Sequence, residues 1–185
     1  MNYDKLTEAV IKAGAGKAVV IPGSKIVTSE SFREICAGNG CGRYGRCWMC
    51  PPDVGEIGEL IEAVKSFPKA LLYQNVFELE DSFDIEGMER SAKLHGQISR
   101  KVEKAVKPLL PEGYLHLING GCGFCETCAK AENKPCISPE NAMASMEGCG
   151  IDVYNTTKDT DLKYINGQDT VTFFSIILLP EDDNV

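Results

Sequence analysis

The stretch ALLYQNVFEL, residues 70–79, is rich in β-branched and aromatic residues and predicts a long β-strand. Downstream, apolar residues recur at helical spacing from about residue 85 to residue 107, and Pro108 ends the pattern. The segment GYLHLING, residues 113–120, predicts a further strand. A strand, a crossover helix and a strand in succession indicate a βαβ unit with parallel strands.

Shorter elements are predicted on both sides of this unit, at residues 3–13 (helix), 17–21 (strand), 53–67 (helix), 138–148 (helix) and 171–179 (strand). We expect Asp53 to cap the helix at 53–67, with Glu56 completing a capping box, and Ser138 to cap the helix at 138–148. An acidic tail, EDDNV, ends the chain. The expected fold is α+β (α/β-like), a single domain over residues 1–185 with a mixed β-sheet flanked by helices and with cysteine-rich loops that hold metal clusters.

The long predicted helix carries a basic stripe opposite its apolar residues. The stripe consists of Lys93, Arg100, Lys104 and Lys107. Such a stripe is typical of a solvated helix face, and the alternative is a docking face for an acidic partner.

Composition and charge exclude several classes of function. No run of about 18 or more apolar residues could span a bilayer, and the N-terminus lacks the basic start and apolar middle of a signal peptide. The net charge of −8 disfavours nucleic acid and anionic membrane surfaces as partners. We therefore expect a cytoplasmic protein. In a reducing cytosol, nine cysteines indicate metal or redox chemistry rather than disulfides.

The segment CGFCETCAKAENKPC, residues 122–136, is the strongest motif. It places Cys122, Cys125 and Cys128 at strict three-residue spacing, with Cys136 after a longer gap. Zinc sites usually take two separated pairs of ligands, whereas thiolates from successive CxxC steps can bind separate irons of a [4Fe–4S] cluster. The spacing favours an iron–sulfur cluster over structural zinc.

An earlier group contains Cys36, Cys41, Cys47 and Cys50 within residues 36–52. Three interpretations remain open for it: a redox-active thiol pair, a zinc knuckle, and a second iron–sulfur cluster, which we favour. The prolines after Cys50 separate it from the next helix and weaken the thiol-pair interpretation. Tyr44 and Trp48 could form an apolar wall around a cofactor, and ordinary core packing is equally compatible with them.

Three segments, CGRYGRCWMCPP, GGCGFCETCAKAENKPC and SMEGCGIDV, occur in this order. In these three segments and their order, the chain resembles a family of predicted metal-binding proteins of unknown function, found in anaerobic archaea and bacteria. The resemblance implies metal binding by Cys36, Cys41 and Cys50, and the family motif asks for nothing in particular at Cys47. Cys149 lies inside the third segment and is a candidate for the fourth ligand of the first site, with a small buried core residue as the alternative.

Signatures of other enzymes are missing. The sequence has no Walker-type loop, no GxGxxG after a strand and no HExxH, and its two histidines, His95 and His116, fit structural positions. We expect an iron–sulfur protein with one or two [4Fe–4S] clusters that exchanges electrons with a redox partner protein. The alternatives are a structural zinc-binding interaction module and an enzyme that uses an incompletely ligated cluster. The sequence does not set the oligomeric state.

Overall fold

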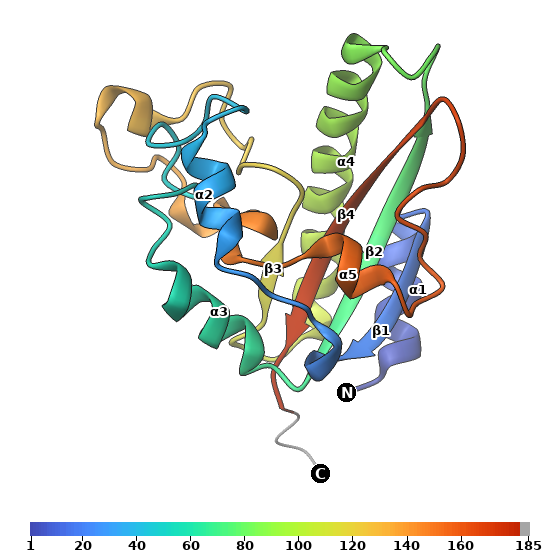
Figure 1. Cartoon of the computed structure of the whole chain (residues 1–185). Helices are drawn as coiled ribbons and strands as arrows, with labels where there is room; N and C mark the ends of the chain where they lie inside the picture. The colour runs from blue at the N-terminus through green and yellow to red at the C-terminus, as the bar shows by residue number, and fades with distance from the viewer. Residues whose placement is uncertain (182–185) are drawn as a thin grey trace.

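The computed structural model describes residues 1–181 and contains a four-stranded sheet with the strand order β1-β2-β4-β3 (Figure 1). The strands are β1 (Lys17–Pro22), β2 (Lys69–Glu78), β3 (Leu115–Leu117) and β4 (Thr170–Leu179). The α-helices are α1 (Tyr3–Lys12), α2 (Ser31–Ala37), α3 (Ile57–Lys65), α4 (Ile85–Val106) and α5 (Val153–Thr157). Most of the expected acidic tail, residues 182–185, lies outside the described residues.

Strand β4 lies inside the sheet, between β2 and β3. Its ten residues pair antiparallel with those of β2, from Thr170 opposite Glu78 to Leu179 opposite Lys69. The six residues from Phe174 to Leu179 are all buried. A strand with a continuous apolar run needs cover on both faces, and the interior position provides it.

The α+β class expected from the sequence is confirmed, and the strand pairing differs from the expected mixed sheet. Strands β2 and β3 point in the same direction, as expected for strands joined by the crossover helix α4, but each pairs antiparallel with β4. Strand β1 also pairs antiparallel with β2. Among the described residues, parallel pairing occurs at one isolated bridge, Ile118–Ser145. The order of elements along the chain does not reveal that the last strand inserts between the two strands of the predicted unit.

The two faces of the sheet are covered differently. Helices α1 and α4 cover one face, where Val10 and Val102 pack in a cluster with Leu71 and Ile177. The other face packs against α3, α5 and the loop that precedes α5. These two apolar clusters form the core and hold the sheet in place beneath the cysteine-bearing loops.

Both histidines lie in a buried polar network between α4 and the sheet. His95 Nε2 lies 2.9 Å from Ser175 Oγ, and His116 Nε2 lies 2.8 Å from Tyr73 Oη. His116 Nδ1 also lies 2.9 Å from a carboxylate oxygen of Glu103. Burial lowers the pKa of His95 to about 4. The network fixes the rotation of α4 against the sheet.

Local elements differ from the prediction in three places. Helix α3 begins at Ile57, and Asp53 forms an ion pair with Lys130 instead of capping it. Helix α2 is absent from the prediction because none of its residues is buried, so it has no apolar periodicity. The segment expected as a helix over 138–148 forms two 3₁₀ turns, separated by an extended stretch that pairs with Ile118.

The loops that carry most of the cysteines lie together near β3, at one edge of the sheet (Figure 1). One loop connects α2 to α3, and the other follows β3. None of the helices within residues 1–181 has the length and apolar character needed to cross a membrane.

Candidate metal site

Eight of the nine cysteines line two pockets formed by these loops. Pocket A is lined by Cys47, Cys122, Cys125, Cys128 and Cys136, and pocket B by Cys36, Cys41 and Cys50. The Arg43 side chain lines both pockets, so they are neighbours. All nine cysteines are free thiols.

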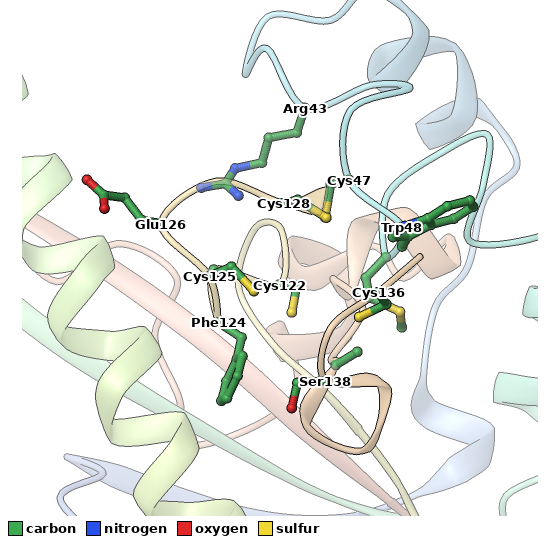
Figure 2. A pocket seen from close by; sticks show the side chains of 13 residues that line it. Arg43, Cys47, Trp48, Cys122, Phe124, Cys125, Glu126, Cys128, Cys136 and Ser138 are labelled. Carbon is green, nitrogen blue, oxygen red and sulfur yellow. The ribbon is translucent and has the colours of Figure 1, made fainter. Parts of the chain in front are cut away.

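The four cysteines of the second motif come together in pocket A, and Cys47 joins them from the first motif (Figure 2). Figure 2 shows the sulfurs of Cys47 and Cys128 side by side, facing the same space as the sulfurs of Cys122 and Cys125. The rest of the wall is mixed, with Trp48, Met49 and Phe124 among its apolar members and Ser138 and Glu126 among its polar ones. The pocket encloses about 440 Å³, including space open to solvent.

Glycines allow the loop around pocket A to turn sharply. Gly120 and Gly123 have φ values of +62° and +58°, which side chains disfavour. Gly121 approaches the first motif closely, because a Cβ built on it would lie 3.1 Å from Cys50 Sγ and 2.7 Å from Arg43 Cδ. The second loop thus packs directly against a thiol of the first.

Arg100 joins α4 to the loop that follows β3 by hydrogen bonds. Its guanidinium donates to the Cys122 carbonyl oxygen at 2.6 Å and to the Asn141 carbonyl oxygen, and it lies 3.5 Å from Cys122 Sγ. It also lies over the Phe124 ring, 5.1 Å from the centroid. Arg100 belongs to the basic stripe of α4, for which the sequence predicts a solvated face or a docking face for a partner. Its side chain is instead directed at the cysteine loop.

Trp48 joins the two loops to each other. Its indole Nε1 donates a hydrogen bond to the Lys134 carbonyl oxygen at 2.9 Å, and Lys130 Nζ lies 4.3 Å from the ring centroid. Lys130 pairs in turn with Asp53 at 2.5 Å, with both side chains 16% exposed. Trp48 lines pocket A and Tyr44 lines pocket B, so each of the two aromatic residues singled out in the sequence lies beside thiols.

Cys47 and Cys50 face different pockets although only two residues separate them. The Cys50 amide donates to the Cys47 carbonyl oxygen at 3.0 Å, and this turn places Cys47 in the wall of pocket A and Cys50 in the wall of pocket B. The thiols remain within reach of each other: a hydrogen bond from Cys50 lowers the pKa of Cys47 to about 5, and the same contact raises the pKa of Cys50, with burial adding to the rise. Cys47 is thus a cysteine of the first motif that lies among the cysteines of the second.

Cys149 lies in the core, 2% exposed, packed with residues that include Met146 and Ile151. It lines neither pocket, and burial raises its pKa to about 12. Glu147, two residues earlier in the chain, lines pocket B instead. Sequence reasoning missed Glu147, although it lies in the same SMEGCGIDV segment that singled out Cys149.

Within the part of the chain that the structure describes, no three His, Cys, Asp or Glu side chains converge closely enough to hold a single metal ion. The thiols are arranged around the walls of two pockets.

The fold and the site define a small cysteine-rich α+β protein. The chain belongs to the family described as predicted metal-binding protein (DUF2284), whose family model matches residues 19–179. The matched region contains all nine cysteines. The resemblance seen in the sequence is thereby confirmed at the level of predicted metal binding. No curated protein and no solved structure matches the chain.

Proposed function

We propose that this protein binds one or two [4Fe–4S] clusters and transfers electrons to or from a redox partner protein. The observation that carries the proposal is the distribution of eight thiols around two adjacent pockets that share Arg43. Cysteine thiolates are the usual ligands of such clusters, and each cluster takes up to four of them. One pocket can supply four, and the other can supply three.

Pocket A fits a cluster by its donors and its surroundings. Cys122, Cys125, Cys128 and Cys136 supply four thiols, and Cys47 is a fifth thiol in the same wall. The Arg100 guanidinium beside Cys122 Sγ would donate to a ligating sulfur, an interaction that tunes reduction potential. The apolar side chains of Trp48 and Phe124 would limit access of water.

The position of the pockets supports the proposed electron transfer. They share a wall, so two bound clusters would be neighbours, and Cys41 and Phe124 are exposed beside them. An exposed edge lets a partner protein approach without a large rearrangement. With a net charge of −8, we expect this partner to be a protein rather than a nucleic acid or an anionic membrane surface. We place the protein in the cytoplasm, where thiols stay reduced.

The three thiols of pocket B favour a second candidate function. A cluster held by Cys36, Cys41 and Cys50 alone would keep one iron without a thiolate ligand. Such an iron can bind a substrate, and the protein would then be an enzyme. The identity of the fourth ligand in pocket B separates this candidate from simple electron transfer.

The test is anaerobic purification and reconstitution of the full chain, followed by iron and sulfide analysis and by EPR after dithionite reduction. We expect about four irons and four sulfides for each cluster, with broad absorption near about 400 nm. Zinc at about two per chain without that absorption would establish the structural zinc alternative instead.

Two matched variants localise the site. Cys128→Ser removes a thiol of pocket A and should reduce iron content, whereas Cys149→Ser alters a core cysteine and should leave it unchanged. Equal iron in wild type and Cys128→Ser would contradict the assignment of pocket A.

A further inference from the structure

We propose that the carboxylate of Glu147 is the fourth ligand of the cluster in pocket B, beside Cys36, Cys41 and Cys50. The inference rests on the proposed function, because it concerns one ligand of one of the proposed clusters. It assigns a role to a residue that the cysteine pattern does not reveal.

The backbone directs Glu147 into pocket B. Ile118 and Ser145 form a parallel bridge, with the Met146 amide donating to the Ile118 carbonyl oxygen at 3.0 Å. Two parallel segments advance together, so the residues that follow each of them reach the same place. Gly120 and Gly121 follow one segment and Glu147 follows the other, and all three line pocket B.

A short turn then holds Glu147 at the pocket. The Ser145 hydroxyl accepts a hydrogen bond from the Gly148 amide at 2.9 Å, and the Gly150 amide donates to the Glu147 carbonyl oxygen at 2.9 Å. Gly148 leaves little room for movement, because a Cβ built on it would lie 2.7 Å from Ser145 Oγ. The carboxylate is therefore presented from a well-ordered turn.

None of the ion pairs within residues 1–181 includes Glu147. Its charge acts on the thiols of Cys36 and Cys149, so the carboxylate lies near both. Glu147 is half-buried, and a carboxylate that is partly removed from water is stabilised by a cationic or metal partner. Binding to an iron of the cluster would give the carboxylate such a partner.

The other candidates for this position point elsewhere. Cys47 lines pocket A, and Cys149 packs in the apolar core beneath Glu147 in the same turn. Among the residues that line pocket B, Glu147 supplies the one carboxylate. With Glu147 bound, the cluster in pocket B is complete, which favours electron transfer over substrate binding.

The experiment compares Glu147→Gln, Glu147→Cys and Glu126→Gln in the full chain, reconstituted anaerobically. Glutamine keeps the shape of the side chain but is a poor iron ligand, and cysteine restores a strong one. Glu126 is an exposed carboxylate at the rim of pocket A, directed away from the cysteine sulfurs (Figure 2), and serves as the matched control. Iron content and EPR-monitored redox titration provide readouts that do not depend on an activity.

We expect Glu147→Gln to lose about one iron per chain, or the whole cluster of pocket B, and Glu126→Gln to lose none. Glu147→Cys should keep the full iron content and shift one reduction potential downward, since thiolate donates more charge to the cluster. Wild-type iron content, EPR spectra and potentials in both Glu147 variants would overturn the assignment, as would loss of iron in Cys149→Ser alone. Wild-type protein without any cluster would instead contradict the proposed function itself.

Discussion

Arg100 on α4 lies 3.5 Å from the sulfur of Cys122 and donates a hydrogen bond at 2.6 Å to the carbonyl oxygen of the same residue. A residue on a rigid helix thus positions the first cysteine of the second motif. The same guanidinium also donates to the Asn141 carbonyl oxygen, so it joins both ends of the loop around pocket A.

Replacing Arg100 with methionine should lower the reduction potential of the cluster in pocket A. A cationic hydrogen-bond donor stabilises the more negative, reduced form, and its loss should shift the potential by on the order of 50 mV, since about 59 mV corresponds to a tenfold change for one electron. An EPR-monitored redox titration measures the shift. Lys104→Met, which changes an exposed charge on the same helix, is the control and should shift the potential much less.

Replacing Gly121 with alanine should disturb pocket B through Cys50. The added Cβ would lie 2.7 Å from Arg43 Cδ, so that side chain must shift, and 3.1 Å from Cys50 Sγ, so the thiol must give by a few tenths of an ångström. We expect loss of iron from pocket B with retention of the cluster in pocket A, measured by iron analysis and EPR. Gly58→Ala in α3 has open space around the added methyl group and should stabilise the helix by up to about 1 kcal/mol without loss of iron. Equal iron content in Gly121→Ala and wild type would contradict the close packing of the two loops.

The ion pair between Asp53 and Lys130 should contribute to folding stability. Both side chains are only 16% exposed, so Asp53→Asn would leave the Lys130 charge poorly solvated, and we expect a loss of about 1–3 kcal/mol in the free energy of unfolding. Denaturant titration of the metal-free, thiol-reduced protein measures it. The matched control is Glu132→Gln, because the Lys134–Glu132 pair is 69% and 64% exposed and should contribute less than about 0.5 kcal/mol. Similar losses in the two variants would show that burial of the first pair has no energetic consequence.

Stability should fall as the pH falls through the range in which His95 titrates in the unfolded chain. Burial lowers its pKa in the folded protein from 6.5 to about 4, so the unfolded state binds the proton first and is favoured by acid. Between about pH 7.5 and about pH 5 this should cost about 2 kcal/mol. His95→Gln should be less stable at neutral pH, because contacts with Ser175 and Asn75 are altered, but its free energy of unfolding should depend less on pH over this range. An identical pH dependence in the two proteins would contradict the role of His95.

Much of the fold could be predicted from the sequence, because its long elements have strong periodicity. The strand at 70–79, the helix at 85–107 and the strand at 171–179 all occur within a residue or two of their expected limits. The order of strands could not be predicted, because pairing between distant segments depends on burial in the assembled sheet. Helix α2 was missed because none of its residues is fully buried, and periodicity reports only a buried face.

The candidate site was only partly visible in the sequence. The spacing of Cys122, Cys125 and Cys128 predicts a shared site, and the structure brings these residues together. The direction of Cys47 depends on a turn and not on spacing, so sequence reasoning could not place it in pocket A. Glu147 reaches pocket B through the pairing of Ser145 with Ile118, a contact between segments 27 residues apart along the chain.

Trp48 is the only tryptophan of the chain, and it lies where the two cysteine loops meet. Its ring lines pocket A and is covered on one side by the Lys130 ammonium group. The protein therefore carries a single intrinsic fluorophore at this contact. Emission from one indole would report both the docking of the loops and the arrival of a light-absorbing cofactor beside it, without any label.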